Sequence, residues 1–136
     1  MPAGSLVLVN QSTEQAVADR VEVAVTRRAR SKGLLGRTSF EVSSALILAP
    51  CLAIHTMFLR FAIDVVFVDE DGRALRMVPE LGPWRVAVEV FAHAVVQLPA
   101  GSLRERHVNV GDRLYLLKES GDRVLLSASD MRERAC

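Results

Sequence analysis

The sequence predicts a mainly β fold: one antiparallel β-sandwich or distorted barrel of about seven or eight short strands with one or two short helices. Three observations support this prediction. Short runs of branched apolar residues recur along the chain, and Gly, Pro, Asp and Asn separate them. Helical segments are too few to supply the crossovers that a parallel sheet needs. A chain of 136 residues suits a single domain over residues 1–136.

The amino-acid composition limits the classes of partner that this protein is expected to bind. Hydrophobic residues make up 50% of the chain and charged residues 24%, as in a globular protein, and aromatic residues are only 5%, so we expect an aliphatic core. The net charge of +1 is too small for non-specific nucleic-acid binding. No apolar run approaches the ~20 residues of a spanning helix, and residues 1–11 contain no basic leader. We therefore expect a cytoplasmic protein without a nucleic-acid or membrane partner.

The first half of the chain predicts three strands and one helix. The segments "SLVLV" and "RVEVAV" (5–9 and 20–25) are rich in branched residues, and the second alternates with a period of two. Thr26 is a suitable N-cap for a short helix that ends at Gly33 or Gly36. The segment "SALIL" (44–48) should be a strand that ends before Pro50, because proline cannot donate a hydrogen bond to a sheet.

The second half predicts a hairpin followed by more short strands. Residues 62–78 contain two apolar runs on either side of the turn "DEDG". The segments "WRVAVEV", "HAVVQLP" and "RLYLL" are further strands, and "AGSLRERH" suits one or two helical turns. Asp112 is expected to accept a hydrogen bond in a turn. Beyond residue 117 the chain should form a last hairpin and then a frayed tail over residues 127–136.

These segments resemble a known family. The runs "ALILAPCLAIHTMFLRFAIDVVFVDEDGRAL", "PWRV", "AVVQLPAGSL" and "VNVGDRL" are similar, in order and spacing, to the bacterial and archaeal domain-of-unknown-function family 192 over roughly residues 20–117. The resemblance implies a compact mainly β domain, with no established activity. Met57 and Phe58 replace a small flexible pair of that family, and Ala62 replaces a proline, so this sequence lacks the family's residues that favour a tight turn there. Other members carry a tryptophan where His55 stands, which argues against a universal acid–base role.

The polar residues of segment 51–64 suggest a pocket for a small polar ligand or a partner peptide. If residues 53–56 paired with residues 63–67 as antiparallel neighbours, His55 would face Asp64, which would otherwise be a buried carboxylate in need of a partner. Arg60 would offer a planar fork of donors to an anion. Trp84, expected in the core or as a partly buried lid, would border the same cleft. The predicted pocket residues are His55, Thr56, Arg60, Asp64, Trp84 and Arg85.

Three functions stay open at this point. The favoured function is a non-enzymatic binding module, because the polar residues do not complete a catalytic set. The second is a hydrolase or transferase in which His55, oriented by Asp64, is the general base and Arg60 stabilises an anion. The third is a purely structural or oligomer-forming domain, and a monomer or a small homo-oligomer would fit.

Cysteine and metal chemistry are not expected. Cys51, Ala53 and His55 would share one face of a strand, but about 13 Å of extended chain would separate the thiol from the imidazole. Cys51 is therefore expected to be a small buried hydrophobic residue, and no disulfide with Cys136 is expected. No histidine or cysteine pair has the short spacing of a metal site, so we expect neither a metal nor another cofactor.

Overall fold

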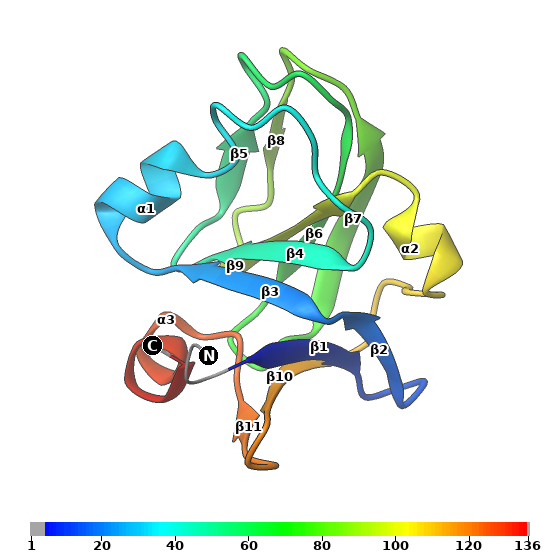
Figure 1. The fold of residues 1–136 in the computed structure, drawn as a ribbon, viewed down its shortest axis with the longest axis vertical. Coiled ribbons are helices and arrows are strands. Elements are labelled where there is room, and N and C mark those ends of the chain that lie inside the picture. Colours follow the sequence, from blue (N-terminus) through cyan, green and yellow to red (C-terminus); the bar gives the residue numbers. More distant parts are fainter. Residues whose placement is uncertain (1–4, 136) are drawn as a thin grey trace.

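The computed structural model describes residues 5–135 and has the predicted mainly β fold. Two sheets pack face to face as a sandwich, and the described strands form no closed barrel (Figure 1). The described chain contains eleven strands rather than seven or eight, because several are very short. Among the described residues, no helix is both long and apolar enough to cross a membrane.

The first sheet lies at the bottom of the view in Figure 1 and is antiparallel throughout. Its strand order is β11-β10-β1-β2. The bounds are β1 Leu6–Asn10, β2 Gln15–Ala18, β10 Leu114–Lys118 and β11 Arg123–Val124. The predicted last hairpin is therefore present as β10 and β11, which pair antiparallel.

The second sheet has the order β3-β4-β9-β6-β7. The bounds are β3 Arg20–Ala24, β4 Ser44–Leu48, β6 Ile63–Val68, β7 Ala74–Leu81 and β9 Ala94–Pro99. The hairpin predicted around "DEDG" is confirmed as β6 and β7. One expectation was wrong: β3 and β4 are parallel. Helix α1 (Arg27–Lys32) lies between them in the chain, so this one pair has the helical connection that parallel strands need.

Two apolar clusters cover the two faces of the second sheet. Side chains of β9 alternate between them: Val96 and Leu98 join the core between the sheets, whereas Val95 joins the cluster on the other face. That second cluster is covered by α1 and by a two-stranded ribbon, β5 (Ala53–His55) with β8 (Val86–Val88). Alternation places Gln97 on the ribbon side of the sheet.

Local signals fix the short helices where the sequence predicts them. Thr26 caps α1, since its hydroxyl accepts a hydrogen bond from the Ala29 N–H at 3.1 Å, and the helix ends at Gly33 with φ of 47°. The single turn α2 (Ser102–Glu105) follows β9, as expected for the segment after "QLP". Asp112 accepts hydrogen bonds from the Asn109 backbone and the Asn10 side chain, in agreement with its predicted role in a turn.

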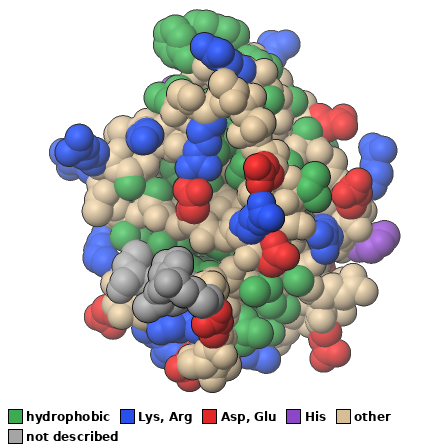
Figure 2. Space-filling model, in the orientation of Figure 1, with side chains coloured by type: hydrophobic (Ala, Val, Ile, Leu, Met, Phe, Trp, Pro, Cys, Tyr) green, Lys and Arg blue, Asp and Glu red, His purple; other side chains and the backbone are tan. Residues whose placement is uncertain are grey.

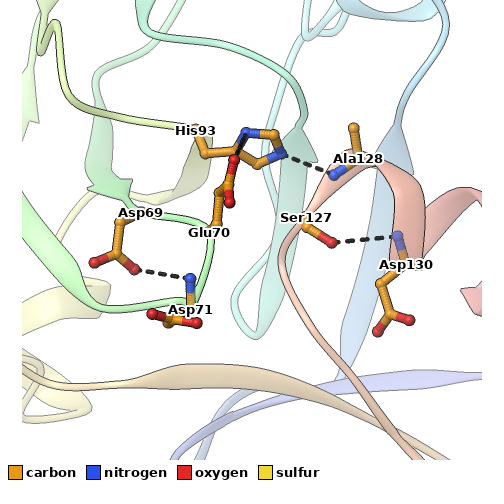
Figure 3. A network of polar contacts seen from close by, with 7 residues as sticks. All are labelled: Asp69, Glu70, Asp71, His93, Ser127, Ala128 and Asp130. Atoms are coloured by element: carbon orange, nitrogen blue, oxygen red, sulfur yellow. Dashed lines mark hydrogen bonds and ion pairs between the residues drawn. The ribbon is translucent and has the colours of Figure 1, made fainter.

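The tail predicted to fray is instead helical over its described part. Helix α3 (Ala128–Asp130) continues into a π-helical turn, Met131–Ala135, and Met131 is fully buried in the core. Figure 3 shows one anchor of this segment: the His93 ring nitrogen Nε2 accepts a hydrogen bond from the Ala128 N–H at 2.9 Å. The tail was expected to fray because most of its residues are polar, but the burial of the apolar Met131 holds it against the core. Cys136, and with it the disulfide question, lies outside the described residues.

Candidate functional site

A cavity of about 320 Å³ lies between helix α1, the β5–β8 ribbon and the second sheet. Its rim is cationic, and its walls are apolar. The cationic lining residues are Arg27, Arg30 and Lys32, and His55 also lines the cavity. The larger apolar lining residues are Leu34, Leu35, Leu48, Ile54 and Leu59. No carboxylate is among the described residues that line it.

Gln97 reaches this cavity from the middle of the sheet. Its strand, β9, lies between β4 and β6, where Gln97 is in register with Leu46 and Val65. Gln97 is 5% exposed, and its side-chain oxygen Oε1 is buried without a hydrogen-bond partner among the described residues. A buried acceptor without a partner lowers the free energy of unfolding by about 1–3 kcal/mol. An amide is therefore not expected on this otherwise apolar face of the sheet. Gln97 was not predicted to be a site residue, although a lone amide in the apolar run "AVVQLP" was the available signal.

Arg30 is held in place at the edge of the cavity by the ends of two strands. Its Nη1 donates to the carbonyls of Val25 at 3.0 Å and Ala49 at 3.4 Å, which directly follow β3 and β4. A guanidinium has five N–H donors, so these bonds leave others for a ligand. Arg27, one turn earlier in α1, also lines the cavity and is exposed.

Cys51 lines the same cavity and is half-buried rather than fully buried as expected. Its thiol donates to the Ala53 carbonyl at 3.2 Å. Burial raises the pKa of the Cys51 thiol above its ordinary value of 9.0, and the hydrogen bond to Ala53 and the charge of Arg30 oppose this only in part. At neutral pH the sulfur is therefore a thiol, which is a poor nucleophile.

Of the six residues predicted to form a pocket, only His55 lines this cavity. The strand pairing assumed for it was wrong: β5 pairs with β8, so His55 lies opposite Val86 and not opposite Asp64. The ring nitrogen Nδ1 of His55 accepts a long hydrogen bond, 3.3 Å, from the Met57 N–H. Cys51, Ala53 and His55, predicted to share one face, all line the cavity, and so does Ile54, which was expected on the other face.

Asp64 is a structural residue of the core. It is fully buried in β6, and its two carboxylate oxygens accept hydrogen bonds from the Glu80 N–H at 2.8 Å and the Leu103 N–H at 2.9 Å. The prediction that a buried carboxylate must have partners is thus met by backbone groups of β7 and α2. Neither His55 nor Arg60 supplies these bonds, so the predicted orientation of the imidazole by Asp64 does not form.

The remaining predicted residues lie in two adjacent loops, 56–62 and 82–85. Thr56 is fully buried, whereas Arg60 and Arg85 are exposed. Trp84, expected in the core or as a lid, is 61% exposed, and its ring centroid lies 4.6 Å from that of Phe58. A turn is present at Met57 and Phe58 despite the larger side chains, closed by the Leu59 N–H on the Thr56 carbonyl at 3.1 Å.

A second cavity, beside β3, has a different character. Its charges are paired with each other: Arg20 contacts Glu41, and Arg37 contacts Glu22 at 2.6 Å. Within residues 5–135 no cluster of three or more His, Cys, Asp or Glu side chains could hold a metal ion. The cavity beside α1 is therefore the candidate site.

Comparison with known families agrees with the sequence. The model of the family DUF192, described as an uncharacterized ACR family, matches residues 7–116. The chain belongs to the DUF192 family. A search of curated proteins found no match.

Two solved structures share the fold of this DUF192 protein. One is a protein of unknown function from Novosphingobium aromaticivorans, with a TM-score of 0.69 and 19% identity over 80% of this chain and 81% of that one. The other is a "putative transcription regulator" from Sinorhizobium meliloti, with a TM-score of 0.70 and 19% identity over 84% of this chain and 95% of that one. At this identity the likeness concerns the fold alone.

Proposed function

We propose that this DUF192 protein is a non-enzymatic binding module whose cavity beside α1 holds a small organic anion that carries a hydrogen-bond donor. The observation that carries this proposal is Gln97, a buried amide that lines a cavity with a cationic rim and whose side-chain oxygen Oε1 has no hydrogen-bond partner among the described residues. A ligand hydroxyl or amine would satisfy that oxygen.

The rim selects for negative charge. Arg27, Arg30 and Lys32 lie on one side of the cavity, and no carboxylate among its described lining residues opposes them. Guanidinium groups bind carboxylates and phosphates through two parallel hydrogen bonds. Because the strand ends hold Arg30, little side-chain freedom is lost when an anion binds.

The size of the cavity favours a small molecule over a peptide. Ligand pockets span about 300–1,000 Å³, and this cavity lies at the small end of that range. Its leucine and isoleucine walls would enclose the apolar body of the ligand, while the arginines and Gln97 bind its two polar ends.

Two features support binding over catalysis. The Cys51 thiol is held in its neutral form by burial, so it is not activated for attack. The ring nitrogen Nδ1 of His55 accepts from the Met57 N–H, and no carboxylate of the described chain bonds to the ring, so the imidazole lacks the orienting partner of a general base.

The test is an NMR titration of labelled protein with a panel of small carboxylates, sulfonates and phosphates, each with and without a hydroxyl or amine. Lactate and propionate are one such pair. We expect members with the donor to shift the Gln97 side-chain amide and to bind about fivefold more tightly, since a net hydrogen bond contributes about 1 kcal/mol. Gln97→Met should abolish that preference.

Neighbouring arginines of α1 provide a matched control. Arg27 lines the cavity, and Arg28 is exposed and does not. Arg27→Ala should weaken anion binding roughly twofold to fivefold, and Arg28→Ala should leave it unchanged. The proposal is wrong if no panel member moves the Gln97 amide, or if both arginine variants weaken binding equally.

A further inference from the structure

Two exposed aromatic side chains project together from the end of the molecule. Phe58 is 69% exposed and Trp84 is 61% exposed, and their rings pack at a centroid distance of 4.6 Å and an angle of 60°. Their loops lie at the top of Figure 1, and Figure 2 shows hydrophobic side chains projecting there with Lys or Arg side chains beside them. We call Met57, Phe58, Trp84 and Val86 the aromatic tip.

The aromatic tip is held rigidly. The buried Thr56 hydroxyl donates to the Gly82 carbonyl at 2.6 Å and accepts from the Arg85 N–H at 2.9 Å, and the Thr56 carbonyl accepts from the Trp84 N–H at 3.0 Å. Phe58 and Trp84 adopt φ of 67° and 64°, which bulky residues rarely do. A strained backbone that presents apolar rings to solvent is typical of a surface that binds a ligand, another protein or a membrane.

The charged residues within the two loops of the tip are both arginines. Arg60 and Arg85 are exposed beside Phe58 and Trp84, and neither forms an ion pair with a carboxylate within the described chain. The segments 51–63 and 81–88, which contain the tip, include no Asp or Glu. The two loops therefore combine protruding apolar rings with two exposed arginines and no carboxylate of their own.

We propose that the aromatic tip docks on an anionic membrane surface. Tryptophan suits the bilayer interface because its ring is apolar and its indole N–H is polar. Arginines at headgroup depth attract acidic lipids. A protruding tip can enter a soft interface, whereas a protein partner would have to provide a fitted groove. The sequence was expected to have no membrane partner because it contains no membrane-spanning segment. Docking on the membrane surface does not require such a segment. This inference is independent of the ligand cavity.

Trp84 is the only tryptophan, so its fluorescence reports on the tip directly. The test mixes the full chain with vesicles of phosphatidylcholine, and with vesicles that also contain phosphatidylglycerol. We expect the emission of Trp84 to shift to shorter wavelength, and the protein to sediment, only with the second kind. Added salt should reverse both effects, because it screens the arginines.

Four variants separate the tip from the rest of the surface. Phe58→Asn should abolish sedimentation, and asparagine tolerates the positive φ, so the fold is kept. Replacing Arg60 and Arg85 by Gln should lower partitioning by about fivefold for each arginine. Phe91→Asn, at an 81% exposed position in the β8–β9 loop, and Arg28→Gln should change nothing.

Several outcomes would overturn the proposal. One is an unchanged Trp84 emission with phosphatidylglycerol vesicles, and another is an equal loss of binding in the Phe58 and Phe91 variants. An equal shift with phosphatidylcholine alone would remove the role of charge. A blue shift that grows with protein concentration in the absence of vesicles would show that a second copy of the chain covers the tip instead.

Discussion

Replacing Gln97 with methionine should stabilise the ligand-free protein. Methionine has a similar length, is unbranched and has no buried acceptor to leave unpaired. Gln97 lies between the apolar Leu46 and Val65 of the neighbouring strands, so the thioether meets a compatible surface. Removing an unsatisfied buried acceptor should recover about 1–2 kcal/mol, the lower part of the cost of leaving one unpaired.

The assay is urea unfolding followed by circular dichroism, because the exposed Trp84 is a poor reporter of the core. We expect the midpoint to rise with an unchanged m-value, and the melting temperature to rise by roughly 3–5 °C for each kcal/mol in a domain of this size. Gln15→Met, at an exposed position of β2, is the control and should stay within about 0.5 kcal/mol of the parent.

A loss of stability in Gln97→Met would refute this reasoning. It would mean that the amide is satisfied in the folded protein without a ligand, and the main support for the proposed cavity function would be removed. A gain in stability together with a loss of the preference for anions that carry a donor would show that the glutamine is kept for binding at a cost to the fold.

Three further predictions concern buried polar groups. Asp64→Asn should destabilise the protein by about 1–3 kcal/mol in urea unfolding, because the amide can accept only one of the two backbone N–H bonds, from Glu80 and Leu103; the exposed Asp71→Asn should have little effect. In a Cys136→Ser background, Cys51 should react with iodoacetamide more slowly than free cysteine at pH 8, because its pKa is raised. The folded protein also prefers the neutral form of this thiol. The thiol's contribution to the free energy of unfolding is therefore complete below pH 9.0 and is lost as the pH rises through the raised pKa of the folded state. Urea unfolding at several pH values would measure this loss.

The elements that the sequence predicted correctly are those with a strong local signal. The β6–β7 hairpin is an example, because Gly72 has φ of 83° in its turn, a backbone conformation that favours glycine. Thr26 and Gly33 likewise mark both ends of α1. In each case the residue type is required by the backbone of its own segment, so no knowledge of the partner strand was needed.

The predicted pocket was misplaced because strand pairing is not a local property. A three-residue strand such as β5 carries too little alternation to select a partner. Its pairing with β8 is instead secured by Thr56, whose backbone and hydroxyl bond to Gly82, Trp84 and Arg85, residues 26 or more positions away. The polar character of Thr56 and Asp64 was interpreted as a sign of function, whereas both residues satisfy backbone groups in the core.

The cavity and the aromatic tip both lie along the β5–β8 ribbon and the loop that follows β5, but they use different residues. His55 faces the cavity, Thr56 turns inward, and Phe58 projects at the tip. If the tip contributed to the ligand site, the Arg60 and Arg85 double variant would weaken anion binding as Arg27→Ala does. We expect lactate binding to be unchanged in that double variant, because neither of its arginines lines the cavity. Two separate binding surfaces would then explain why segment 51–64 carries polar residues, and no catalytic set would be needed to explain them.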